Sequence, residues 1–158
     1  MGDPKFEIAM AYPQMESYYG ALVGLCFTVP YAVSGLYTGS ITRRGNRKWM
    51  LMGVIGMMSL LQLGTGAINS FAALAIFRFL HGAISSSVNP MCFSLVSDYF
   101  PPDKRTTANS ILSAANFVGI ALSSMTILLI KQVGWRSSYM AMGGMGLLGG
   151  LLMLLLKN

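Results

Sequence analysis

Arg78 and His81 are the two ionisable nitrogen side chains in the long apolar stretch from Trp49 to Ser97. They lie about one helical turn apart, and no other residue from Trp49 to Ser97 carries a charge or an imidazole. A guanidinium stays protonated, and placing one among lipid tails costs at least ~2.5 kcal/mol. Two interpretations of Arg78 stay open. It lines a polar cavity or relay, or it holds helices together by bonding to backbone carbonyls and serines.

His81 is the only histidine in the sequence. A metal site needs several ligands, and no second histidine, paired cysteine or nearby glutamate accompanies this one. A lone imidazole could carry protons within a membrane, but one group does not make a relay. We therefore expect His81 to bond to a neighbouring helix, and we predict no metal and no cofactor.

No catalytic constellation can be drawn from the sequence. Asp98 and Asp103 lie several helical turns from His81, and catalytic groups must converge within hydrogen-bonding distance. Residues 144–149 match the G-x-G-x-x-G fingerprint as text, but a dinucleotide site needs a strand before it and a polar helix mouth after it. This stretch lies in an apolar run, where close helix packing is the better interpretation. We predict that the protein is not an enzyme.

The elements that position these residues are predicted to be membrane-spanning helices. Of the 158 residues, 54% are hydrophobic and 10% are charged, whereas soluble domains carry about 25% charged residues. A helix needs about 20 apolar residues to cross the hydrocarbon. The uncharged runs predict an all-α integral membrane protein with about five spans, near residues 18–38, 49–67, 71–99, 111–130 and 139–156.

The chain is predicted to form one domain over residues 1–158, since no linker or change in composition divides it. Residues 1–16 are too polar to span and are expected to lie at the membrane interface. Pro101 and Pro102 should end the third span. Residues 134–136, Gly-Trp-Arg, predict a turn at the interface in which Trp135 is an aromatic anchor.

The net charge of +6 is concentrated beside the predicted spans. In a soluble protein such a charge could indicate nucleic-acid binding, but here the positive-inside rule accounts for it. We predict no nucleic-acid partner, and we place the basic loops, residues 40–48 and 101–109, on the inner side of the membrane. Their cations are Arg43, Arg44, Arg47 and Lys48 in the first loop, and Lys104 and Arg105 in the second.

Four short motifs follow one another along the chain. Residues 39–48 form the first basic loop, residues 78–82 lie in the third span, residues 98–108 lead into the fourth, and residues 134–136 precede the fifth. The residues that define these motifs are Gly39, Arg43, Arg44, Arg47, Lys48, Arg78, His81, Gly82, Asp98, Arg105, Trp135 and Arg136.

These motifs resemble those of the major facilitator superfamily, and within it the Spinster-type sugar-phosphate and lipid carriers. Residues 39–48 are similar to the family's G-x-x-x-D-R-x-G/N-R-K loop, and residues 78–82 to its fourth-helix R-x-x-x-G motif. Residues 98–108 resemble its D-x-F-x-x-x-x-R-x-x-A segment, and residues 134–136 the G-W-R turn before its sixth helix. The resemblance covers nearly the whole chain and maps it onto the second to sixth helices of the family's N-terminal half.

The resemblance implies a fold of two six-helix bundles that rock against each other around a central solute site. It implies that Arg78 takes part in coupling or substrate handling and that the loop motif gates the inward side. Two residues depart from the pattern: Arg43 replaces an acidic residue, and Ser85 stands where Spinster-type carriers often have one. No span precedes Tyr18 and no second bundle follows, so we expect a partial six-helix half-bundle.

Two functions remain open. The first is a transporter-derived accessory or structural subunit that moves no solute and sits against other subunits of a larger membrane complex. An organellar energy-converting complex, for example in the mitochondrial inner membrane, is one such host. The second is part of a secondary active transporter that moves a small organic solute together with a second transporter half. In both cases the lipid bilayer surrounds the chain.

Overall fold

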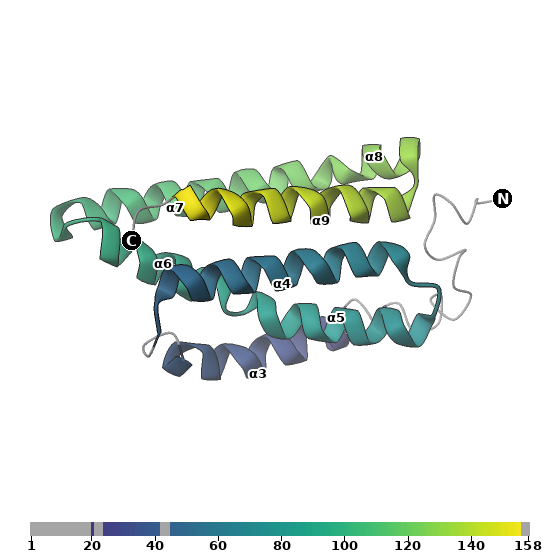
Figure 1. Cartoon of the computed structure of the whole chain (residues 1–158), viewed down its shortest axis with the longest axis horizontal. Helices are drawn as coiled ribbons and strands as arrows, with labels where there is room; N and C mark the ends of the chain where they lie inside the picture. The colour runs from purple at the N-terminus through teal and green to yellow at the C-terminus, as the bar shows by residue number, and fades with distance from the viewer. Residues whose placement is uncertain (1–19, 21–23, 42–44, 156–158) are drawn as a thin grey trace.

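The computed structural model describes residues 20, 24–41 and 45–155, and the described elements are helical (Figure 1). This confirms the predicted all-α architecture. The predicted interfacial segment, residues 1–16, lies outside the described residues, as do Arg43 and Arg44. In chain order the helices are α3 (Cys26–Ile41), α4 (Arg47–Ala67), α5 (Phe71–Ser85), α6 (Val88–Tyr99), α7 (Pro102–Ser124), α8 (Thr126–Val133) and α9 (Trp135–Leu152), followed by the 3-10 turn η2 (Met153–Leu155).

Four stretches of the described chain are long and apolar enough to cross a membrane, and they match the second to fifth predicted spans. Their bounds are Arg47–Ala67, Phe71–Tyr99, Pro102–Val133 and Trp135–Leu155. Helix α3 has 16 residues within the described range. It corresponds to the first predicted span, near residues 18–38, but continues to Ile41.

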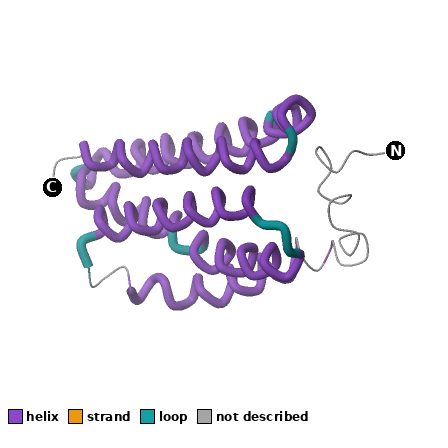
Figure 2. Tube along the Cα trace, turned by 45° about the vertical axis from the view of Figure 1, so that its right-hand side comes forward, coloured by secondary structure: helices purple, strands orange, loops and turns teal. Residues whose placement is uncertain are grey.

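The third predicted span is divided into α5 and α6 at Ser86 and Ser87 (Figure 2). Pro90 lies in the first turn of α6 and has no N–H with which to continue the ladder of helical hydrogen bonds. At the break the two serine hydroxyls donate to preceding carbonyls, Ser86 to Ala83 at 2.9 Å and Ser87 to Ile84 at 2.6 Å. Short polar side chains thus satisfy part of the interrupted backbone.

The predicted basic loop at residues 101–109 is wrong, because α7 already begins at Pro102. Proline suits the first position of a helix, where its missing N–H would have no partner. Asp103 in the first turn is favourable beside the positive end of the helix dipole. Lys104 and Arg105 therefore lie on a helix. The first basic loop is also shorter than predicted, since Ile41 ends α3 and Arg47 begins α4.

Gly134 makes the whole connection between α8 and α9. Its φ of 88° lies in the left-handed region, which glycine adopts without strain. The turn directs Trp135 inward, where only 2% of the residue is exposed and it packs against Leu74. The prediction that Trp135 anchors the membrane interface is therefore wrong. Its ring belongs to the core.

Helices α4 and α9 form the most extensive helix–helix contact, and small residues allow it. A Cβ on Gly143 would lie 2.9 Å from the carbonyl oxygen of Ser59, and one on Gly146 would meet the Ser59 hydroxyl. Gly144 and Gly149 have nothing within 4 Å of an added Cβ. The packing interpretation of residues 144–149 is thus confirmed for Gly146 alone of its three glycines.

Helix α7, like α8, is little covered by the other described helices. None of its residues is buried, and it packs only lightly against α6 and α8. Apolar side chains such as Ile111 and Phe117 are 65% and 72% exposed. In lipid such side chains need no protein partner, so this exposure is compatible with a membrane-facing helix.

Candidate functional site

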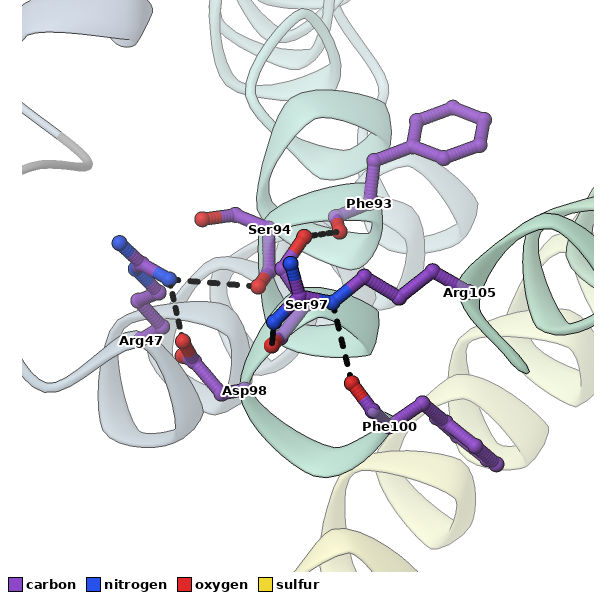
Figure 3. A network of polar contacts seen from close by, with 7 residues as sticks. All are labelled: Arg47, Phe93, Ser94, Ser97, Asp98, Phe100 and Arg105. Atoms are coloured by element: carbon purple, nitrogen blue, oxygen red, sulfur yellow. Dashed lines mark hydrogen bonds and ion pairs between the residues drawn. The ribbon is translucent and has the colours of Figure 1, made fainter. Parts of the chain in front are cut away.

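A polar network formed by Arg47, Asp98 and Arg105 joins three helix ends (Figure 3). Arg47 in the first turn of α4 donates from Nη1 to Asp98 Oδ1 at 2.5 Å and to the Ser94 carbonyl at 3.3 Å. Both acceptors lie in the last two turns of α6. The network brings together residues from two sequence motifs, residues 39–48 and 98–108. It thereby places Arg47 and Arg105 at the same end of the molecule.

Arg105 completes the network from the other side. Its Nη2 donates to the Ser97 carbonyl at 2.8 Å, and its Nε donates to the Phe100 carbonyl at 3.0 Å (Figure 3). The last carbonyls of a helix lack partners within the helix, and a cation beside them interacts favourably with the dipole. Arg105, in the first turns of α7, therefore caps the C-terminal end of α6.

The Arg47–Asp98 ion pair is open to solvent, with 31% and 47% of the two side chains exposed. Ion pairs of this kind contribute at most about 1 kcal/mol, because water and salt screen them. Such a contact can form and break at small cost. Its chemistry suits a reversible link between helix ends better than a fixed structural bond.

We expect Asp98→Asn to lower the free energy of unfolding by less than about 1 kcal/mol. Arg105→Gln should instead loosen the last turn of α6, since two carbonyls lose their charged donor. Hydrogen exchange at the Phe100 amide, which bonds to the Val96 carbonyl at 3.0 Å, reports on this turn. Faster exchange in Arg105→Gln with little change in Asp98→Asn is the expected result. The reverse order would contradict these roles.

Arg78 lies on α5 and points to α9. Its Nη2 donates to the Tyr139 hydroxyl at 2.5 Å, and its guanidinium carbon lies 5.8 Å from the centre of the Tyr139 ring. Both residues are half-buried. If Arg78 holds helices together, the sequence predicts that it bonds to backbone carbonyls and serines. The partner in the structure is instead the phenol hydroxyl of Tyr139. Only one of five guanidinium N–H groups is used in this bond.

Tyr139 packs against Trp135, the aromatic residue of the buried core. Its ring meets that of Trp135 edge-on, with centroids 6.2 Å apart. The guanidinium of Arg136 lies 4.7 Å from the Trp135 ring centre. Trp135 and Tyr139 are four residues apart on α9 and so share one face. Sequence reasoning missed Tyr139, although its spacing from Trp135 within a span was the available signal.

His81 and Gly82 lie where α5 crosses α3. The His81 ring lies beside that of Phe27, with centroids 6.2 Å apart. Gly82 is buried, and a Cβ there would meet the carbonyl oxygen of Phe27. The described contact of His81 is therefore an aromatic one, and its hydrogen bond to a neighbouring helix stays a prediction. Gly82 allows the two backbones to approach closely.

Among the remaining motif residues, Lys48 lies in the first turn of α4. Lys48 is buried, and its Nζ lies 6.0 Å from the Trp49 ring centre. Gly39 lies in α3, but its surroundings fall outside the description, as do Arg43 and Arg44. The structure thus brings the motif residues together in groups: the polar network at one end, Arg78 against the aromatic core, and Gly82 at the α3–α5 crossing.

Comparisons with known proteins agree with this geometry. The family model described as Major Facilitator Superfamily matches residues 7–158. "Protein spinster homolog 1" of Bos taurus is 27% identical over 96% of this chain and 30% of its own length. The "Gallate transporter" of Pseudomonas putida is 30% identical over 73% of this chain and 26% of its own length. The chain therefore spans less than a third of these relatives.

The fold is similar to that of a bacterial homologue of the human lysosomal transporter Spinster, solved in an inward-facing and unoccupied conformation. The TM-score is 0.72 at 24% sequence identity, over 98% of this chain and 39% of that protein. At this identity the likeness establishes the fold alone.

These findings support a relationship to transporters rather than an accessory role. They lend no support to a subunit of a larger complex, or to the mitochondrial membrane in particular. They agree with an integral, multi-pass membrane protein. By its family match, its motifs and its fold, the chain belongs to the Major Facilitator Superfamily.

Proposed function

We propose that this chain is part of a secondary active transporter that moves a small organic anion, and that it forms one side of the solute pathway. Secondary transporters of this family build their solute site between two bundles that move against each other. The described helices amount to part of one bundle, so the remaining wall must come from other helices.

The observation that carries the proposal is the arrangement of Arg78. It is the only cation in the stretch Phe71–Tyr99, and the Tyr139 hydroxyl orients it while leaving other N–H groups available. A fixed cation at membrane depth attracts an anion, and a planar guanidinium suits a carboxylate. One relative is named as a transporter of gallate, which is a carboxylate.

The polar network supports the same proposal. An exposed ion pair that links α4 to α6 can open and close at small cost, as a gate at one end of a rocking bundle requires. The family resemblance assigns gating of the inward side to the loop motif, residues 39–48, which includes Arg47. The proposal extends this role to the contact between Arg47 and Asp98.

Extraction of the native protein in mild detergent, followed by native mass spectrometry and reconstitution into liposomes, tests the proposal. We expect saturable uptake of a carboxylate that exceeds uptake of a neutral or cationic analogue. The species that supports uptake should contain helices beyond those of this chain, either in a longer polypeptide or in a second subunit. A large stoichiometric complex that moves no solute would instead favour the accessory role.

A further inference from the structure

Three aromatic rings lie next to one another where α3 crosses α5. The rings of Phe27 and Tyr31 are stacked, with centroids 5.9 Å apart and planes inclined by 24°. The His81 ring lies 6.2 Å from that of Phe27 and is inclined to it by 38°. These three residues are referred to below as the ring cluster. The proposed function so far uses none of them.

Helix α5 places the ring cluster beside Arg78. Residues three apart in a helix are neighbours on one face, so His81 follows Arg78 on the same side, about 4.5 Å further along the axis. Phe27 reaches the same place from α3, because Gly82 lets the two backbones approach closely. A solute that binds the Arg78 guanidinium on this face therefore meets the ring cluster.

Arg78 and the ring cluster remain partly accessible. Phe27 and His81 are half-buried, and Tyr31 is 37% exposed. Among the described residues, Arg78 has the Tyr139 hydroxyl as its one hydrogen-bond partner, and the His81 imidazole has none. The other guanidinium N–H groups and the imidazole nitrogens are thus available to a ligand.

A cation beside flat apolar rings suits a carboxylate that is attached to a ring. The planar guanidinium binds a carboxylate through parallel N–H bonds. Aromatic rings attract one another at centroid distances of about 4.5–7 Å, and this attraction adds to the gain from apolar burial. A saturated chain lacks the added attraction. A polyhydroxylated chain would lose its water against rings that offer few hydrogen-bond partners.

We propose that the solute is an aromatic carboxylate, whose carboxylate binds Arg78 and whose ring packs against the ring cluster. Phe27 and His81 are then specificity-determining residues. They select the solute by its ring, whereas Arg78 selects it by its charge. This inference rests on the proposed transport function and names the class of its solute.

Benzoate and cyclohexanecarboxylate test the inference, because they share charge and number of carbons and differ in the aromatic ring. Burial of apolar area alone gives no preference for the flat ring. The native protein, extracted with any helices that complete it, is reconstituted into liposomes for uptake of each acid. Binding to the same preparation in detergent is measured by saturation-transfer NMR. We expect benzoate to bind about fivefold more tightly.

Phe27→Leu tests the ring cluster itself. Leucine keeps an apolar side chain but removes the ring, so the preference for benzoate should disappear. Phe79→Leu is the matched control, because Phe79 is on α5, is 52% exposed and has no ring neighbour among the described residues. The ratio of the two affinities is compared within each variant, so a partial loss of folded protein does not change it.

Equal affinity of the native protein for the two acids would overturn the aromatic solute and leave transport of a carboxylate intact. A preference for benzoate that survives in Phe27→Leu would overturn the ring cluster as its source, as would an equal loss in Phe79→Leu. Uptake of gluconate without binding of either ring acid would overturn the aromatic solute alone. If none of the three carboxylates binds, the proposed function fails with it.

Discussion

Gly82→Ala should detach α3 from α5 and destabilise the bundle more than alanine at any other glycine whose surroundings the structure describes. A Cβ at Gly82 would meet the carbonyl oxygen of Phe27, with that residue's carbonyl carbon and Cα at 3.1 Å. These are backbone atoms, so no side-chain rotation relieves the clash. We expect a loss of about 3 kcal/mol, at the upper end of the usual range for overpacking. Total stabilities are only about 5–15 kcal/mol.

The measurement is thermal unfolding in detergent, together with hydrogen exchange along α3. Gly53→Ala and Gly119→Ala are matched controls, because an added Cβ at either position has nothing within 4 Å. Alanine favours a helix over glycine by about 1 kcal/mol, so the controls should be neutral or slightly stabilised. If Gly82→Ala melts with the controls and leaves exchange in α3 unchanged, the close crossing at Phe27 is not required for folding.

The sequence predicted the positions of the four described spans because hydropathy over some 20 residues is a strong signal. It was less successful at their ends and interruptions. Residues 102–109 are polar and so favour a loop, yet Pro102 and Asp103 form a favourable start for α7. Polar residues mark where a helix leaves the hydrocarbon. They do not mark the residue at which the helix itself begins. The division at Ser86 and Ser87 depends on how Pro90 is accommodated, which periodicity does not reveal.

The candidate site was likewise predictable from the sequence only in part. The motif spacing marked Arg47, Asp98 and Arg105 as important, but their pairing became visible only when the helix ends were placed side by side. Because tryptophan is common at the interface, the sequence predicts that Trp135 lies there, whereas the turn at Gly134 directs it inward. An amphipathic ring fits either environment. Its position is therefore decided by tertiary packing.

Arg78 and Tyr139 should behave as a coupled pair in a double-mutant cycle. Tyr139→Phe removes the hydroxyl that accepts from Arg78 but keeps the ring that the guanidinium faces. Hydrogen bonds to charged groups contribute about 1.5–3 kcal/mol, and a half-buried site falls toward the lower end. Arg78→Leu should cost at least as much, because the Tyr139 hydroxyl then loses its charged donor. Thermal unfolding in detergent measures each variant.

The coupling energy separates a direct contact from two independent effects. Contacting residues show interaction energies of about 0.5–3 kcal/mol, whereas the effects of distant residues add. In the Arg78→Leu background, Tyr139→Phe should therefore cost markedly less than it does in the native chain. Additive losses would contradict the described hydrogen bond. Leu80→Ala, exposed on the same helix, serves as a control for general loosening of α5.

The same variants distinguish an organising role for Arg78 from a transport role. If Arg78 only holds α5 to α9, Arg78→Leu and Tyr139→Phe should reduce assembly and uptake together. If it also receives the anion, Arg78→Leu should abolish uptake even at a temperature where the protein is fully folded. Tyr139→Phe, which keeps the cation but frees its orientation, should then weaken apparent affinity while leaving uptake measurable. Undiminished uptake of a carboxylate by folded Arg78→Leu would exclude Arg78 as the counter-charge, because no other cation lies in that span.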